Sequence, residues 1–328
     1  MQAARRRSCR RHRPRPPRRP LRSPAAESGH PPCSARCRGS PPVRSPLVNA
    51  PFGPQHWAHC GGTTRDHGPI SAAAMTGLPS PGDALLRFEP LTEGVLLKRY
   101  KRFLADVELS SGETVTAHCA NTGPMTGVLI PGQRVRLRYA PSPKRKLAWT
   151  WEQAEVPGAD GQPCWVGINT ALPNRLIRAT VEAGCLEAQL GGIEGIRAEV
   201  AYGTNKRSRI DLLLTPSAQN PDQRPIYLEV KNTTWTDGST ALFPDTVTER
   251  GQKHLIELMG VLPDARAVLV PCLSRPDVTA FAPGDSADPR YGELFRQATN
   301  SGVEVLPCCF SFSADAVHWQ GTRLVHLD

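Results

Sequence analysis

The chain of 328 residues contains no apolar run long enough to cross a membrane and none that matches the core of a signal peptide. A membrane-spanning helix needs about 20 consecutive apolar residues. A secretory signal needs a shorter apolar stretch between a basic start and a cleavage site. We therefore expect a cytoplasmic protein with no membrane partner. At this length the chain has room for two domains.

The ten cysteines do not form the disulfide framework that is typical of small secreted proteins. Four of them fall within the first 74 residues, and the other six are dispersed. Cys33 and Cys37 have a spacing that some zinc sites use, but no matching second pair follows. We expect reduced, mostly buried thiols and no zinc site.

Residues 1–74 contain no lysine and only one Asp and one Glu, but 14 arginines, for a net charge of +12. The rest of the chain carries 26 basic and 28 acidic side chains, so the overall charge of +10 comes from this segment. Rich in proline and almost without apolar periodicity, the segment is expected to be disordered. It could be a basic arm for polyanions, an organellar presequence, or upstream codons wrongly joined to a chain that starts at Met75. The absence of lysine favours the third explanation.

Asp211, Glu229 and Lys231 stand inside two largely apolar runs. The first run, 208–214, contains Asp211, and the second, 226–232, contains Glu229 and Lys231. Both runs are rich in Ile, Leu and Val and predict short buried strands. Glu229 and Lys231 share a face because side chains alternate along a strand. If the strands form a hairpin, Asp211 lies beside them.

Two interpretations of these charges stay open, since burying a charge is costly unless it pairs or binds something. Two carboxylates can hold a hard cation such as Mg²⁺, and a neighbouring lysine can orient or activate a water. This Asp…Glu-x-Lys arrangement is that of metal-dependent phosphodiester nucleases. The structural alternative is a buried ion pair between Asp211 and Lys231, with Glu229 at a strand end.

The segments around these runs predict an α/β domain. Strand patterns continue at 196–202, which includes Glu199, and at 265–271, while helical patterns cover 170–184 and 245–262. This order of elements predicts a mixed sheet with helices on both faces. Extended backward, the apolar stripe of the second helix passes through Gln252. Three further polar residues surround the same helix end, namely Arg250, Lys253 and His254.

An all-β domain precedes it. Five short strand patterns suit a small OB-type barrel, and they cover 91–99, 103–109, 114–119, 133–139 and 147–156. Trp149 and Trp151 share a face of the last strand, so both belong to the core or both to the surface. We place this nucleic-acid-binding domain at 85–157 and the α/β domain at 165–312.

Basic residues cluster at two places on the predicted barrel, where they can follow a phosphate backbone. The first cluster comprises Lys98, Arg99, Lys101 and Arg102, and the second comprises Lys144, Arg145 and Lys146. Near Asp211, positive charge is added by Arg209, Arg250 and His254. We expect all of these residues to contact nucleic acid.

Taken together, these motifs resemble the sugar fermentation stimulation protein A family. They follow in the same order from about Phe88 to about Val305, and they are Lys98-Arg-Tyr-Lys-Arg-Phe-Leu-Ala-Asp106, His118-Cys-Ala-Asn-Thr-Gly-Pro-Met125, Ser208-Arg-Ile-Asp211, Glu229-Val-Lys231-Asn and Phe243-Pro-Asp245 through His254. The resemblance implies a two-domain α+β or α/β protein, in which an N-terminal OB-fold β-barrel precedes a PD-(D/E)xK nuclease-like α/β domain with a mixed central sheet. It also implies non-specific DNA binding. Asp211, Glu229 and Lys231 are, by this resemblance, the Asp, Glu and Lys of the nuclease motif. Pro124 departs from the pattern in a way that affects loop shape. The start of family-like sequence soon after Met75 also favours a chain that begins there.

Two hypotheses of function follow. In the first, the protein is a nuclease that depends on Mg²⁺ or Mn²⁺, with Asp211 and Glu229 as metal ligands, Lys231 acting on water, and Glu199 and Gln252 in support. In the second, it is a non-catalytic DNA-binding regulatory factor acting on sugar (maltose) metabolism. The three charges favour the nuclease, because a scaffold could lose them. We expect DNA as the partner, RNA stays open, and the sequence makes no prediction of oligomeric state.

Overall fold

The computed structural model describes residues 71–72, 79–203 and 208–327. Almost all of residues 1–74, with Cys33 and Cys37, therefore lie outside the described residues, as does the predicted chain start at Met75. The described residues form a six-stranded, a nine-stranded and a four-stranded sheet. None of their helices is long and apolar enough to span a bilayer.

The six-stranded sheet closes into the OB barrel. Strands of the barrel follow the order β5-β4-β3-β6-β7-β8, and a parallel pairing of β5 with β7 closes it. All five predicted strands are confirmed, and β8 is added at the edge of β7. Their bounds are β3 Thr92–Tyr100, β4 Leu104–Leu109, β5 Thr114–Cys119, β6 Arg134–Tyr139, β7 Trp149–Pro157 and β8 Pro163–Gly167.

The barrel core is formed by the inward-facing residues, which alternate with outward-facing ones along each strand. In β4, Ala105 and Val107 are fully buried between more exposed neighbours, as expected for a strand with one face inward. Gly94 permits the close approach of β3 to β4, because a Cβ atom there would lie 2.6 Å from a Val107 methyl group. Trp151 is fully buried and Trp149 packs against the same core, so the shared face is the inner one.

The nine-stranded sheet is mixed, as predicted. Its order is β1-β2-β18-β17-β14-β11-β10-β9, with β16 beside β14. β10 and β11 form the expected antiparallel hairpin, whereas β11 and β14 run parallel. The bounds are β1 Ser71–Ala72, β2 Ala84–Arg87, β9 Ile193–Tyr202, β10 Ser208–Pro216, β11 Ile226–Thr233, β14 Arg266–Leu273, β16 Glu304–Val305, β17 Cys308–Phe312 and β18 Ala316–Thr322.

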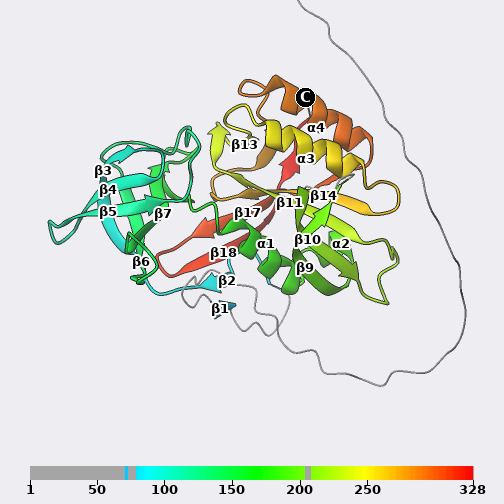
Figure 1. Ribbon diagram of the computed structural model, residues 1–328, viewed down its shortest axis with the longest axis horizontal. Helices are drawn as coiled ribbons and strands as arrows, with labels where there is room; N and C mark the ends of the chain where they lie inside the picture. Colours follow the sequence, from blue (N-terminus) through cyan, green and yellow to red (C-terminus); the bar gives the residue numbers. More distant parts are fainter. Residues whose placement is uncertain (1–70, 73–78, 204–207, 328) are drawn as a thin grey trace, which may run out of the picture. The chain divides into compact units, whose positions relative to one another are not determined.

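Helices cover both faces of this sheet (Figure 1). α1 (Pro173–Glu182) and α2 (Glu187–Leu190) pack on one face, and α3 (Glu249–Met259) and α4 (Pro289–Asn300) pack on the other. The central strands are therefore apolar on both sides and show little polar alternation. In β11, Leu228 and Val230 lie in the core beneath α1, while Tyr227 packs into the core beneath α3.

Several elements differ from the sequence-based prediction. α4 and a small four-stranded sheet were not predicted; the latter consists of β12 Trp235–Asp237, β13 Thr240–Phe243, β15 Ala280–Pro283 and β19 Leu324–Val325. α3 begins at Glu249 rather than near Asp245, because the Thr248 hydroxyl accepts the Gly251 N–H at 3.1 Å and caps the helix. The barrel does not begin at residue 85, since β2 pairs with β18 and belongs to the large sheet, which extends past residue 312.

Candidate metal centre

Asp211 lies in β10 at a point where the strand is irregular. Ile210 belongs to the core beneath α3 and Leu212 to the core beneath α1. Residues two apart in a regular strand share a face, so the backbone turns over at Asp211. Glu199 stands opposite in β9, between the paired positions, and its φ of 55° marks the same distortion.

Two hydrogen bonds hold the Asp211 carboxylate. Its Oδ2 accepts the backbone N–H of Val230 at 2.8 Å, and its Oδ1 accepts the side-chain amide of Asn174, in the first turn of α1, at 2.8 Å. Burial, and then the negative charge of Glu229, raise the pKa of Asp211 to about 6. The two carboxylates therefore repel each other, and a cation between them would relieve that repulsion.

Glu229 is 2% exposed and is surrounded by two basic side chains. Lys231 Nζ donates to Glu229 Oε1 at 2.7 Å and lies 3.0 Å from Nδ1 of His254, which also contacts Oε1. Burial raises the pKa of Glu229, but the hydrogen bonds and charges of His254 and Lys231 outweigh it, and the net pKa is lowered. Glu229 is therefore ionised at neutral pH. The ion pair of Lys231 is with Glu229, not with Asp211 as the structural alternative had it.

The second oxygen of Glu229 decides what the site can hold. Oε2 is buried and has no hydrogen-bond partner among the described residues. An unsatisfied buried carboxylate oxygen is costly, and a cation would satisfy it. Mg²⁺ usually takes one or two carboxylates and keeps waters or substrate phosphates as its other ligands. Asp211 and Glu229 fit that donor set.

The side chains that the structure describes do not enclose a metal site on all sides. The described residues contain no group of three or more His, Cys, Asp or Glu side chains placed to hold an ion.

Two predicted supporting residues do not join the centre. Glu199 has an exposed side chain, because its left-handed backbone breaks the strand alternation, and its carbonyl accepts Arg209 at 2.9 Å. Gln252 donates to both oxygens of Asp288 at 3.0 Å, and Asp288 also caps α4. Gln252 therefore links α3 to α4 rather than supporting Asp211 and Glu229.

His254 was expected to share the start of the second predicted helix with Arg250 and Lys253 and to contact nucleic acid, but its side chain, unlike theirs, is buried. It is 5% exposed and lies against Glu229 and Lys231. The buried positions of α3 are Gly251, His254, Leu255 and Leu258, spaced three, one and three residues apart. This spacing was visible in the sequence, but the stripe was extended backward through Gln252 instead.

The barrel's first basic cluster has a partly structural task. Arg99 donates to the carbonyls of Asn121 at 2.8 Å and Gly123 at 3.0 Å, and Arg102 donates to that of Thr122 at 2.9 Å. These two arginines hold the loop after β5. Lys98 lies 3.4 Å from Asp106, while Lys101 is exposed at the β3–β4 turn.

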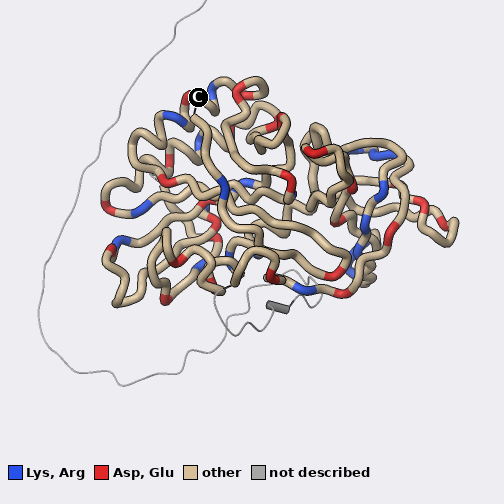
Figure 2. Tube along the Cα trace, turned by 180° about the vertical axis from the view of Figure 1, so that it is seen from behind, with Lys and Arg blue, Asp and Glu red and all other residues tan. Residues whose placement is uncertain are grey.

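The other residues predicted to contact nucleic acid also include both bonded and exposed side chains. Arg145 donates to the Ala140 carbonyl at 2.9 Å, and Arg209 is bonded to β9. The remaining three, Lys144, Lys146 and Arg250, have exposed side chains. Figure 2 shows basic and acidic residues interspersed along the described trace, so positive charge is gathered only locally.

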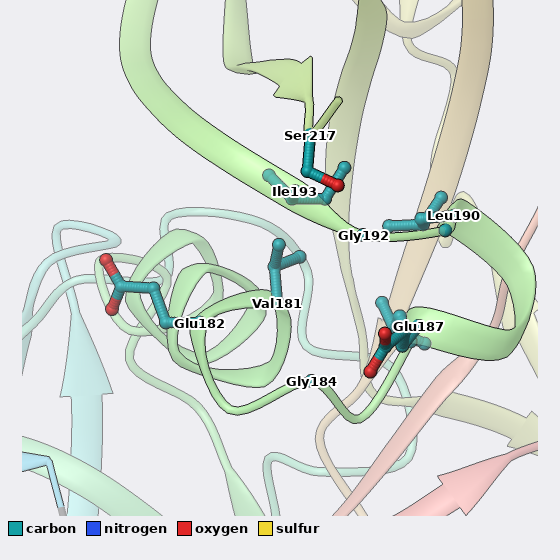
Figure 3. Close-up of a pocket in the computed structure, with 10 residues that line it drawn as sticks. Val181, Glu182, Gly184, Glu187, Leu190, Gly192, Ile193 and Ser217 are labelled. Carbon is teal, nitrogen blue, oxygen red and sulfur yellow. The ribbon is translucent and has the colours of Figure 1, made fainter. Parts of the chain in front are cut away.

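A cavity of about 210 Å³ lies elsewhere, at the C-terminal end of α1 (Figure 3). Val181, Gly184, Glu187 and Ser217 are among its lining residues. Asn174, which binds Asp211, is in the first turn of the same helix. The cavity is therefore separate from the candidate metal centre.

Comparisons with known proteins agree with this architecture. Residues 97–168 match the family model described as "SfsA N-terminal OB domain", and residues 171–316 match "Sugar fermentation stimulation protein RE domain". A "Sugar fermentation stimulation protein homolog" of Synechococcus sp. (strain CC9605) is 97% identical over 253 residues, which is 77% of this chain and 100% of that protein. The chain belongs to the sugar fermentation stimulation protein family.

Other members of the sugar fermentation stimulation protein family are also similar. The homolog of Parasynechococcus marenigrum (strain WH8102) is 86% identical over 249 residues, covering 76% of this chain and 98% of that protein. Among solved structures, "The structure of Pyrococcus Furiosus SfsA in complex with Ca2+" superposes with a TM-score of 0.64 at 26% identity, covering 74% of this chain and 99% of that one.

Proposed function

We propose that this protein is a divalent-cation-dependent nuclease that binds nucleic acid without sequence preference. The observation that carries the proposal is that the two carboxylate oxygens of Glu229 have different surroundings. Its Oε1 is bonded to Lys231 and His254, while its buried Oε2 has no partner among the described residues and lies on the carboxylate that repels Asp211.

Asp211 and Glu229 would hold Mg²⁺ or Mn²⁺, and the bound cation would stabilise negative charge on a phosphate and lower the pKa of a water. The residues around them prepare this donor pair. Asn174 and the Val230 N–H fix the Asp211 carboxylate, and His254 with Lys231 fixes Glu229. Lys231, which is bonded to Glu229, would orient the attacking water or stabilise charge on the phosphate.

The solved relative supports the choice of a hard cation. That protein is in complex with Ca²⁺, and calcium, like magnesium, takes oxygen ligands such as carboxylates. The OB barrel supports the choice of nucleic acid, because this fold commonly binds single strands through a basic groove. Lys101, Lys144 and Lys146 are exposed on it and would contact phosphates. DNA is the proposed substrate.

One observation favours the second candidate, a non-catalytic DNA-binding regulatory factor of sugar (maltose) metabolism. Lys231 and His254 already compensate one oxygen of Glu229, so the cluster could hold β11 and α3 together without any cation. In that case the protein would bind DNA and not cleave it.

Incubation with labelled single- and double-stranded DNA and RNA, in Mg²⁺, Mn²⁺, Ca²⁺ or EDTA, separates these candidates. We expect cleavage in Mg²⁺ or Mn²⁺, none in EDTA, and none by the Asp211→Asn variant. Asp237→Asn, which changes an exposed carboxylate in β12, is the matched control and should cleave normally. Binding without cleavage in every metal would favour the regulatory factor.

A further inference from the structure

A second charged cluster surrounds Glu152, in β7 of the barrel. Arg138 donates to Glu152 Oε1 at 2.8 Å, and the Asn169 amide donates to Oε2 at 2.8 Å. Glu152 is only 9% exposed. Both of its oxygens are therefore bonded, and its charge is paired with one arginine.

Two more arginines, Arg145 and Arg175, lie close enough to Glu152 and Arg138 to interact with their charges. Arg145 precedes β7 and donates to the Ala140 carbonyl and to the Thr150 hydroxyl at 2.5 Å. Arg175 is partly buried in the first turn of α1, and its backbone N–H donates to the carbonyl of Leu172, which lines one small cavity together with Arg138 and Glu152. Burial, and then the positive charge of Arg138, lower the pKa of both arginines, whereas Glu152 raises it.

Three guanidinium groups thus lie near the Glu152 carboxylate, and only that of Arg138 is bonded to it. Like charges that gather in a partly buried place destabilise the fold unless a counter-charge joins them. Arg175 is the clearest case, because its guanidinium group has no hydrogen-bond partner among the described residues. A planar guanidinium presents several donors in a geometry that matches the oxygens of a phosphate.

The place of the cluster in the fold indicates which phosphate it would bind. Arg175 follows Asn174, whose amide holds Asp211 at 2.8 Å, while Arg138 and Arg145 belong to the barrel. Lys144 and Lys146 flank Arg145 and are exposed, so basic groups continue from the cluster onto the barrel surface. Spaced cations of this kind suit the successive phosphates of a strand better than a single free anion.

We propose that Arg138, Arg145 and Arg175 bind a backbone phosphate of a nucleic-acid strand between the OB barrel and Asp211. This inference rests on the proposed function and adds to it the route by which the strand reaches the metal centre. Arg175 is the residue that decides it, because the other two arginines also bond to the protein. The contact is to the sugar-phosphate backbone, so it is independent of base sequence.

The test is the affinity for a labelled 12-nucleotide oligothymidylate in EDTA, measured by fluorescence anisotropy over a range of salt concentrations. Without metal the strand is bound but not cleaved. We expect Arg175→Gln to weaken binding about tenfold and to reduce the slope of log K against log salt by about 0.7. Arg178→Gln is the matched control, because Arg178 is exposed on the same helix and pairs with Glu182 at 2.8 Å. It should bind within about twofold of the wild type.

Thermal melting separates this role from a structural one. The Arg175 guanidinium group lies near the like charge of Arg138 and makes no hydrogen bond to the described residues, so Arg175→Gln should melt at or above the wild-type temperature, whereas loss of a structural arginine would lower it. If Arg175→Gln keeps the affinity and the salt slope of the wild type, this inference is overturned and the proposed function is not. Competition by polyglutamate as strong as that by unlabelled oligonucleotide would overturn the phosphate assignment. A wild-type chain that binds no nucleic acid would contradict both this inference and the proposed function.

Discussion

Lys231 Nζ lies 2.7 Å from Oε1 of Glu229, two residues before it in β11, and Glu229 Oε2 has no hydrogen-bond partner among the residues that the structure describes. Alternation along the strand places both side chains on one face, and His254 from α3 completes the contact. Lys231 and His254 therefore both contact the same oxygen of Glu229, and neither contacts Oε2.

Asp211→Asn should abolish Mg²⁺ binding while leaving the fold intact. The amide keeps the shape of the side chain but loses the negative charge that a hard cation needs. Isothermal calorimetry of wild type and variant measures the binding, and the far-ultraviolet circular dichroism spectrum checks the fold. A wild-type chain that binds neither Mg²⁺ nor Mn²⁺ would contradict the assignment of Asp211 and Glu229 as ligands.

The stability of the cation-free protein should fall as pH rises from about 4 to about 6. The pKa of Asp211 is raised from 3.8 to about 6 in the fold, so the folded state holds a proton that the unfolded state has released. Stability decreases with pH wherever the folded state binds more protons, here by at most about 3 kcal/mol. Urea unfolding at several pH values, compared with Asp211→Asn, isolates this contribution. An Asp211→Asn variant that loses as much stability across the window as the wild type would contradict it.

Local pattern was enough to predict that Asp211, Glu229 and Lys231 lie close together, because strand alternation and hairpin pairing depend on neighbouring residues. It failed for Glu199, where the backbone takes a φ of 55° that alternation does not anticipate. It also placed Gln252 rather than His254 on the buried face of α3, because the apolar positions of a helix can be extended backward along either of two neighbouring faces.

Long-range pairing was beyond the reach of sequence patterns. β2 pairs with β18, so residues near 85 and near 317 meet in one sheet although no local signal connects them. For the same reason, the barrel's boundary was placed too early. The arginines around Glu152 were missed because β6, β7 and α1 contribute them from separate parts of the chain, and only Arg145 belonged to a visible cluster.

Lys231→Met should keep cation binding and slow hydrolysis by about 100-fold or more, because the lysine acts on the water or the phosphate rather than on the metal. Glu229 loses a buried partner, so a loss of stability of about 3 kcal/mol is also expected. Single-turnover cleavage and calorimetry, both at a temperature where the variant is folded, separate the two effects. Loss of cation binding together with cleavage would show that Lys231 mainly shapes the ligand set.

His254→Gln should weaken Mg²⁺ binding by about tenfold, because the residue holds Glu229 Oε1 and so orients the oxygen that is free. Lys253→Gln is the control, since Lys253 is its exposed neighbour and bonds to Ser208 instead. Calorimetric titration with Mg²⁺ measures both. Equal affinities in the two variants would mean that Glu229 is positioned by Lys231 and the backbone alone.

Substitutions of the barrel's basic residues should have two different effects, depending on whether the side chain is exposed or bonded to the rest of the protein. Lys101→Gln, Lys144→Gln and Lys146→Gln should each weaken binding to all oligonucleotides alike and reduce the salt slope by about 0.7 for a single strand, with no change in melting temperature. Arg99→Gln should lower the melting temperature, because Arg99 holds the carbonyls of Asn121 and Gly123. Anisotropy titrations against several unrelated sequences and thermal melts give both quantities. Strong discrimination between unrelated sequences by the wild type would contradict backbone recognition, since phosphate contacts carry no base information.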